Sequence, residues 1–323
     1  MIRQLLGIVL FYGRFSFSFS RIGWLRRRRG FEAIGKQLEG KHVVITGASG
    51  GIGAAAVAGC IDAGATVTAV ARSPEKLARL KQRHGDQVTL LTCDLAESSQ
   101  VALMAEDLAD MQPVDVLINN VGVMLHEFQQ NSDGTDLQFA TNLLNHYLLT
   151  ESLITNGALH ATSQVINVAS GGMYMAPMVI GKLFAGDAAD HDGTTAYAIQ
   201  KRAQVMLTHY WQQRETEARR FNVMHPGWVD TAGVQQSLPT FRKLMRPILR
   251  SAVEGADTIV WLAACAPNGD TSDQIWLDRE LCKVHAYSFT RSASADIDAL
   301  LEALNEALPA DLAESLQAPA EPD

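Results

Sequence analysis

The segment Thr46–Gly53, which reads TGASGGIG, constrains the fold of this chain more than any other. It follows a short β-branched run, His42–Ile45, and leads into a run of small residues typical of a helix, Ala54–Ala63. A glycine-rich turn between a strand and a helix points main-chain N–H groups at one place, where they bind a phosphate. A plain glycine turn is the alternative, and the flanking strand and helix argue against it.

Three glycines have separate roles in such a turn. Gly47 lets the chain turn tightly, Gly51 lets the main chain approach a pyrophosphate, and Gly53 lets the helix lie close to the strand. The segment therefore predicts a dinucleotide-binding site at the end of the first strand.

Strands and helices alternate along the chain, and most strands are apolar on both faces. We expect strands at His42–Ile45, Thr66–Val70, Val88–Leu91, Val114–Ile118, Val165–Val168, Phe221–Met224 and Gln274–Leu277, and helices at Ala54–Ala63, Pro74–Arg83, Ser99–Met111, Leu137–Leu153, Tyr197–Arg219 and Val253–Ala264. This pattern predicts an α/β fold: a Rossmann-type, doubly wound parallel sheet with helices on both faces, in a single domain.

The 323 residues divide into three parts. Residues 1–40 form a basic, partly apolar arm, and residues 41–290 form the cofactor-binding catalytic domain. In residues 291–323 we expect a helix at Ala295–Ala307 and a mobile, acidic, Pro/Ala-rich tail at Pro309–Asp323. The four cysteines are scattered without a CxxC pair, which favours a reducing, cytoplasmic location and predicts no metal site.

The charge is unevenly distributed. The net charge of −8 argues against nucleic acid as a partner, yet residues 1–31 contain seven arginines and no acid. The apolar run Leu5–Tyr12 is interrupted by Arg14, short of the roughly 20 residues that a membrane span needs. Residues 1–30 therefore suit peripheral contact with an anionic membrane. Packing on the domain or on a second subunit, and cleavage as a targeting peptide, stay open.

The second strand ends in Val70-Ala71-Arg72-Ser73. Sites for NAD usually place an acid at this strand end to bind the ribose 2′-hydroxyl, whereas an arginine matches the 2′-phosphate of NADP. Glu75 falls in the helix that follows. We predict that NADP(H) is preferred, and NAD(H) stays open because Arg72 could also stack on adenine or face solvent.

Tyr197 and Lys201 are four residues apart, so on a helix they share a face. A nearby ammonium lowers the pKa of a phenol from its usual value near 10, which suits Tyr197 to exchange a proton with a carbonyl or hydroxyl oxygen. Ser170, after the fifth strand, is placed to hydrogen-bond the same oxygen.

Six motifs in this order carry a resemblance. They are Thr46–Gly53, Asp94, Asn119-Asn120-Val121-Gly122 followed by Asn142, Ser170, Tyr197-x-x-x-Lys201, and Pro226-Gly227-x-x-x-Thr231. Over about residues 41–280 the chain resembles the short-chain dehydrogenase/reductase family. It is most similar to the branch called dehydrogenase/reductase member 12, near the retinol-dehydrogenase-like enzymes.

The resemblance implies a catalytic set of Ser170, Tyr197, Lys201 and Asn142, in which Lys201 also binds the nicotinamide ribose and Asn142 supports a water-linked proton path. It implies pairing into homodimers or homotetramers through the helices that carry Asn142 and Tyr197. The cofactor-binding residues that we expect are Thr46, Gly47, Ser49, Gly51, Ile52, Gly53, Arg72, Asp94, Leu95, Asn120, Gly122, Tyr197, Lys201, Pro226, Val229 and Thr231.

Two departures from the family pattern concern the substrate. Val121 replaces the usual alanine, and Ser170 and Tyr197 are 27 residues apart, about twice the common spacing. The extra segment Gly171–Ala196 is rich in methionine and aromatic residues, and Gln235–Ser251 is the expected substrate lid. Both favour a small apolar carbonyl or alcohol substrate, with ordinary packing as the alternative.

Four cations of the lid are candidates for contact with an anionic substrate or a membrane, or for a solvated face: Arg242, Lys243, Arg246 and Arg250. The sequence thus predicts a reversible carbonyl/alcohol oxidoreductase. The alternative is a regulatory or assembly protein that binds the cofactor with little turnover.

Overall fold

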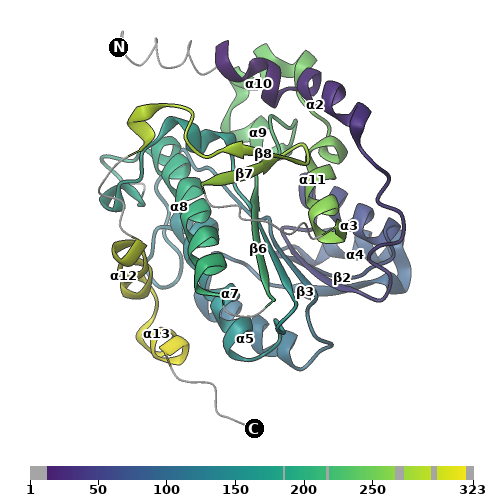
Figure 1. Ribbon diagram of the computed structural model, residues 1–323. Coiled ribbons are helices and arrows are strands. Elements are labelled where there is room, and N and C mark those ends of the chain that lie inside the picture. Colours follow the sequence, from purple (N-terminus) through teal and green to yellow (C-terminus); the bar gives the residue numbers. More distant parts are fainter. Residues whose placement is uncertain (1–12, 185, 216–217, 266–272, 292–296, 318–323) are drawn as a thin grey trace.

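The computed structural model describes residues 13–184, 186–215, 218–265, 273–291 and 297–317. Its centre is an eight-stranded sheet in the order β3-β2-β1-β4-β5-β6-β7-β8, parallel except for the last strand (Figure 1). The strands are β1 (His42–Thr46), β2 (Thr66–Ala71), β3 (Val88–Thr92), β4 (Val116–Asn119), β5 (Gln164–Val168), β6 (Arg220–Met224), β7 (Gln274–Leu277) and β8 (Glu280–Lys283).

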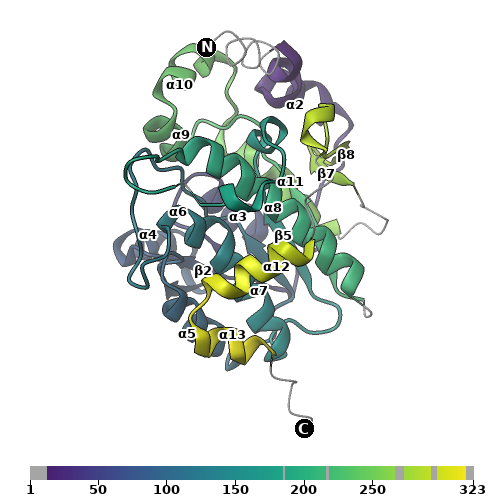
Figure 2. The same ribbon diagram turned by 90° about the vertical axis from the view of Figure 1, so that its left-hand side faces the viewer.

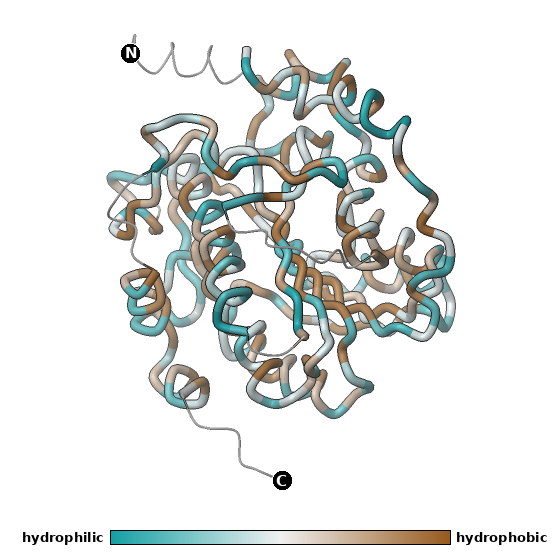
Figure 3. Tube along the Cα trace, viewed as in Figure 1, coloured by the Kyte–Doolittle hydropathy of each residue, from teal (hydrophilic) through white to brown (hydrophobic). Residues whose placement is uncertain are grey.

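Helices cover both faces of the sheet (Figures 1 and 2). One face carries α3 (Gly51–Asp62), α4 (Pro74–His84) and α11 (Ala252–Cys265), and the other carries α5 (Ser98–Ala109), α7 (Asn145–Thr155) and α8 (Gly193–Arg214). Neighbouring residues of β1 serve both layers: Val44 packs with the α5/α7/α8 side, and Val43 and Ile45 pack with the α3/α11 side. The central strands are therefore rich in hydrophobic residues, which appear as brown stretches of the tube in Figure 3.

The predicted fold class is confirmed, with seven strands where the sequence placed them. β8 was missed because Glu280–Lys283 is short and mostly exposed. The smaller elements are α2 (Arg21–Arg27), α6 (Leu137–Phe139), α9 (Ala232–Ser237), α10 (Pro239–Met245), α12 (Ile297–Ala307), α13 (Ala310–Gln317), a π-helical segment (Ala140–Leu144), and 3₁₀ turns at Arg28–Gly30, Gly85–Gln87, Gly171–Met175, Ile180–Lys182, Arg246–Ile248 and Ser288–Thr290.

The described part of the N-terminal arm packs on the domain. Phe15 and Phe19 are buried and their rings stack at 4.3 Å between centroids. The buried Arg250 donates hydrogen bonds to the carbonyl oxygens of Ser18 and Ser20 and forms an ion pair with Asp278. The expectation that Arg250 faces solvent, substrate or membrane was therefore wrong, because a paired guanidinium here ties the arm to the β7–β8 turn.

The C-terminal helices lie across α7 and α8 (Figure 2). Leu300, Leu304 and Leu308 are buried in the same core as these helices, and the Tyr147 hydroxyl donates a hydrogen bond to Asn305. The expectation of a mobile tail from Pro309 onward was wrong for residues 310–317, because the amphipathic α13 packs its apolar side on that core. Residues 318–323 lie outside the described residues.

The close contact at Gly53 yields a test of the fold. A Cβ there would overlap the carbonyl oxygen of Gly47 and lie 2.7 Å from Asn120 Nδ2, so Gly53→Ala should lower the free energy of unfolding by about 1–3 kcal/mol. Gly50→Ala is the matched control, because Gly50 is extended and nothing lies within 4 Å of its Cβ position. Urea denaturation without cofactor should show a change within about 0.5 kcal/mol for the control. Equal losses in both variants would contradict this account.

Candidate active site

The sequence-predicted residues gather at one edge of the sheet. The loops that follow β1, β2, β3, β4, β5 and β6 carry the glycine segment, Arg72, Asp94, Asn120, Ser170 and Pro226. Because these strands are parallel, their carboxyl ends meet at the same edge, and the strand order reverses between β1 and β4. Such a reversal leaves a crevice at the strand ends, where open α/β sheets bind their ligands.

The glycine loop has the geometry that a pyrophosphate needs. Gly47 and Gly51 have positive φ angles of 66° and 53°, which favour glycine. The N-terminus of α3 has no side-chain cap and no acidic residue in its first turn, so its N–H groups are free to bind an anion. The residues present therefore fit a dinucleotide, with Gly51 beside Thr231.

Thr46 and Asn120 join the loop after β1 to the loop after β4. The Thr46 hydroxyl donates to the Ile118 carbonyl and accepts hydrogen bonds from the main-chain N–H groups of Asn120 and Val121. The Asn120 side chain donates to the Thr46 carbonyl at 2.8 Å. These two residues hold the phosphate loop in place, and their side chains are engaged within the protein.

Arg72 and Asp94 lie together at the ends of β2 and β3, where the sequence predicts adenosine binding. The Arg72 side chain is 71% exposed, and its nearest acidic group is Asp94 at 4.0 Å. Asp94 accepts a hydrogen bond from the Ala96 N–H. Ser73 caps α4 and donates to Glu75, which places that carboxylate on the helix and leaves Arg72 as the charged group at the strand end.

Ser170 and Tyr197 meet beside Gly172. A Cβ on Gly172 would lie 3.6 Å from Ser170 Oγ and 3.9 Å from the Tyr197 ring. Burial raises the pKa of Tyr197 above its ordinary value, and a hydrogen bond with Ser170 acts in the opposite direction. Tyr197 therefore holds its proton at neutral pH, whereas its spacing from Lys201 predicted a lowered pKa.

Lys201 lies behind Tyr197, with its Nζ atom 5.8 Å from the centroid of the Tyr197 ring. It is buried and donates hydrogen bonds to the Val168 carbonyl at 2.9 Å and to Gln204 Oε1 at 3.0 Å. Burial lowers its pKa to about 7. A Cβ on Gly122 would lie 3.2 Å from this ammonium, so a side chain there would press on it.

Asn142 sits in the π-helical segment Ala140–Leu144, where the sequence predicted a continuous helix. Its side chain accepts from the Val123 N–H and donates to the Val123 carbonyl and to Gln200. A π-helical turn redirects main-chain groups, and such turns occur frequently at functional sites. Asn142 lies near Lys201, since a Cβ on Gly122 would be 3.4 Å from Asn142 Oδ1 and 3.2 Å from Lys201 Nζ.

The structure adds residues that the sequence argument missed. Gln204 joins Lys201 to α7, and Gln138 joins Gln200 to the loop after β4. Their positions on the Tyr197 and Asn142 helices were the one available signal. The amides of Asn119 and Asn167 extend this buried network across β4 and β5.

The residues expected at the nicotinamide follow β6. Thr231 caps α9 by accepting from the Val234 N–H, and the Pro226 carbonyl accepts from Arg250. Val229 pairs with Arg250 in an isolated bridge and lies against Gly255. The buried Arg250–Asp278 pair therefore supports both the arm and the loop of the expected nicotinamide site.

The long segment between Ser170 and Tyr197 contributes mostly to the core. Met173, Tyr174, Met178 and Leu183 are buried, which favours the packing interpretation for these four. The Phe19 ring of the arm fills the space where a Cβ of Gly171 would lie, next to Ser170. The same ring packs edge-on against Trp228. The arm is thus part of the wall beside the reactive residues. In the expected lid, Arg242 forms an ion pair with Asp230.

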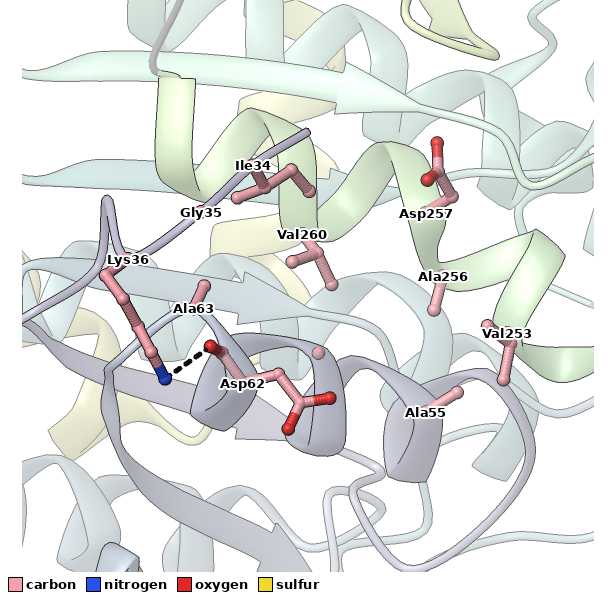
Figure 4. Close-up of a pocket in the computed structure, with 11 residues that line it drawn as sticks. Ile34, Gly35, Lys36, Ala55, Asp62, Ala63, Val253, Ala256, Asp257 and Val260 are labelled. Atoms are coloured by element: carbon pink, nitrogen blue, oxygen red, sulfur yellow. Dashed lines mark hydrogen bonds between the residues drawn. The ribbon is translucent and has the colours of Figure 1, made fainter. Parts of the chain in front are cut away.

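Two cavities lie elsewhere. One of about 420 Å³ lies between residues 34–36, α3 and α11, and Figure 4 shows Ile34, Val253 and Val260 at its margin. The other, of about 920 Å³, is bounded by residues 128–136, 180–184 and 303–309 and by Gly186. None of the predicted site residues lines either cavity. Among the described residues there is no group of three metal-ligating side chains, and no helix that could span a membrane.

Comparison with known proteins agrees with this geometry. A family model described as "short chain dehydrogenase" matches residues 41–241. The chain is 35% identical to dehydrogenase/reductase SDR family member 12 of Homo sapiens over 84% of this chain and 87% of that protein. It is 28% identical to human retinol dehydrogenase 12 over 74% of this chain and 85% of that protein.

A solved structure is also similar. It is a putative NAD(P)-dependent gluconate 5-dehydrogenase from Beutenbergia cavernae with bound NADP, 25% identical, with a TM-score of 0.56 over 72% of this chain and 93% of that one.

Proposed function

This chain belongs to the short-chain dehydrogenase/reductase family and is an NAD(P)-dependent oxidoreductase acting on CH–OH or C=O groups, and we propose that it uses NADP(H) on a small apolar substrate with Tyr197 as general acid/base. The meeting of Ser170 and Tyr197 beside Gly172, with the Lys201 ammonium behind the phenol, carries this proposal. NADP would supply the hydride acceptor, and NADPH the hydride donor, at the nicotinamide.

The side chains divide the remaining work. In carbonyl reduction the Tyr197 hydroxyl donates its proton to the substrate oxygen while the Ser170 hydroxyl hydrogen-bonds that oxygen and steadies its charge. The raised pKa of Tyr197 keeps the phenol protonated and ready to donate. In alcohol oxidation the phenolate must accept the proton, and the positive charges of Lys201 and of an oxidised nicotinamide favour that form.

The preference for NADP(H) rests on Arg72. Its side chain is exposed at the end of β2, and a 2′-phosphate offers it a bidentate partner. The apolar substrate is proposed from Phe19, which lies against Gly171 next to Ser170 and packs edge-on on Trp228, and from the similarity to a retinol dehydrogenase. A regulatory protein that binds the cofactor without turnover is the alternative, and the intact Ser170, Tyr197 and Lys201 argue against it.

Pairing of two chains is proposed from the family resemblance alone. The α7 and α8 surfaces that the family resemblance indicates for pairing contact α12 and α13 here. A homodimer or homotetramer through these surfaces requires the C-terminal helices to move.

Peripheral membrane contact is proposed for residues 1–30. In the described part of this arm, Phe17, Ile22 and Leu25 are exposed large hydrophobic residues. Arg26, Arg28 and Arg29 are exposed, and they form no ion pair with the described residues. Both views place α2 and α10 at the same end of the molecule, where Leu244 is 73% exposed beside Lys243 (Figures 1 and 2). Exposed apolar groups among cations suit an anionic lipid surface.

Tyr197→Phe tests the proposed chemistry. NADPH consumption with all-trans-retinal as the probe should fall by about 10²–10⁴-fold, because the general acid is lost, while the Kd for NADPH changes little. Tyr147→Phe is the control, since this buried phenol contacts Asn305 on the far side of the helix layer. Undiminished turnover in Tyr197→Phe would reject the mechanism, and absence of turnover in the wild type with every apolar carbonyl tried would favour the regulatory alternative.

Arg72→Ala tests the choice of cofactor. The Kd for NADPH should rise about 10–100-fold, because a hydrogen-bonded charge pair with the 2′-phosphate is lost, and the Kd for NADH should stay within about twofold. Fluorescence titration with both cofactors measures this. A wild-type protein that binds NADH more tightly than NADPH would overturn the preference.

Charge removal tests the membrane contact. A triple variant, Arg26→Gln, Arg28→Gln and Arg29→Gln, should bind mixed phosphatidylcholine/phosphatidylserine vesicles about a hundredfold more weakly, at about 1 kcal/mol per arginine. The control triple Lys76→Gln, Arg79→Gln and Arg83→Gln removes the same charge from exposed positions on α4. Cosedimentation with pure phosphatidylcholine should show weak binding throughout, and equal binding by both triple variants would contradict the proposal.

A further inference from the structure

One buried amide contacts Lys201 directly and has no role in the chemistry described so far. Gln204 lies one turn after Lys201 on α8 and is buried. Its Oε1 atom accepts a hydrogen bond from Lys201 Nζ at 3.0 Å. Its Nε2 atom is 2.7 Å from both the Asn142 carbonyl oxygen and His146 Nδ1. All the hydrogen-bonding groups of the amide face partners from the catalytic region.

The orientation of this amide is fixed by its surroundings. An ammonium only donates and a carbonyl oxygen only accepts, so the amide oxygen must face Lys201 and the amide nitrogen must face Asn142. A flipped amide would place nitrogen against the ammonium and oxygen against the carbonyl. The nitrogen's second hydrogen then points at His146 Nδ1, so that atom accepts and the ring carries its hydrogen on Nε2. Burial lowers the pKa of His146 to about 3, which keeps the ring neutral.

We infer that Gln204 is a positioning residue for the proposed hydride-transfer reaction: its side chain fixes the Lys201 ammonium and ties it to the Asn142 carbonyl and the His146 ring. Lys201 then has two anchors, the Gln204 oxygen and the Val168 carbonyl at the end of β5. The ammonium is held at a set distance behind Tyr197 rather than moving within its pocket.

The Gln204 side chain connects Lys201 directly to the main chain of Asn142. The family resemblance implied a water-linked proton path at Asn142, but here the Asn142 carbonyl accepts from the Gln204 amide and its side chain is bound to Val123 and Gln200. A carboxamide keeps both hydrogens at neutral pH, so it orients charge and does not relay a proton. Gln204 therefore acts by holding the charge state and the position of Lys201.

The few polar groups around Lys201 give its hydrogen bond with Gln204 a large effect on the charge of the ammonium. The ionisable side chains near it in the described structure are Tyr197 on α8 and the neutral His146 on α7. From β5 and the loop after β4 it meets the Val168 carbonyl and Gly122. Burial has already lowered the pKa of Lys201 to about 7. The gain or loss of one hydrogen-bond acceptor therefore changes the charge of Lys201 near neutral pH.

The test measures the titration of Lys201 without any substrate. Protein labelled with ¹³C at the lysine Cε atoms is titrated by NMR, and the Lys201 signal is assigned by its loss in Lys201→Met. Gln204→Met removes the acceptor and should lower the Lys201 midpoint by about one pH unit or more. Gln204→Glu keeps the shape, places a carboxylate beside the ammonium, and should raise the midpoint by about 1–3 units.

Gln200→Met is the matched control. Gln200 is a buried amide on the same helix, bound to Asn142, Gln138 and Leu183, without contact to Lys201. It should lower stability to a similar extent and leave the Lys201 midpoint unchanged. Midpoints within about 0.2 unit of the wild type in both Gln204 variants would overturn the inference, as would an equal shift in Gln200→Met.

An activity measurement completes the test. With retinol as the probe, the acidic limb of the pH profile for oxidation should move to higher pH in Gln204→Met, because the phenolate loses a nearby positive charge. A profile that stays in place despite a shifted Lys201 midpoint would also count against the inference. If the wild type turns over neither retinol nor retinal, the proposed function fails on these probes while the NMR titration still decides the role of Gln204.

Discussion

The joint between the ends of β1 and β4 is the contact on which the rest of this structure depends. The Thr46 hydroxyl and the Asn120 side chain close the joint, and Gly53 lets α3 begin directly against the Gly47 carbonyl. Because the sheet is parallel and its strand order reverses here, a crevice forms at this edge, and the joint fixes the loop after β1 against the loop after β4 beside it.

Charge inside the protein supports the site in two places. The Arg250–Asp278 pair is buried on both sides, and it holds the main chain of the arm at Ser18 and Ser20 together with the Pro226 carbonyl. A buried pair of this kind is costly to break, since the remaining charge would lack a partner. The Lys201 ammonium is held differently, by neutral acceptors, and burial lowers its pKa to about 7. Burial also lowers the pKa of Arg250, but the Asp278 carboxylate offsets part of that effect.

The buried polar network links these parts to the sheet. Asn119 on β4 donates to Asn167 on β5, which donates to Thr208 on α8, one turn from Gln204. Amides and hydroxyls in the interior are stable only when their partners are fixed, so such a network favours one arrangement of α7 and α8 over the sheet. That arrangement in turn sets the positions of Asn142, in the π-helical segment that leads into α7, and of Tyr197 and Lys201 on α8.

The sequence alone determined the α/β class, seven of the eight strands and the residues at the strand ends, because period, glycine spacing and the four-residue step from Tyr197 to Lys201 are local signals. Tertiary structure decided what depends on partners distant in sequence: the burial of Arg250 against Asp278, the packing of α13, the π-helical turn at Asn142, and the contact of Gln204 with Lys201. A sequence shows that a glutamine or an arginine is polar, but it does not show which groups surround the side chain. Only the groups that surround it in the fold decide whether it is solvated or holds a charge in place.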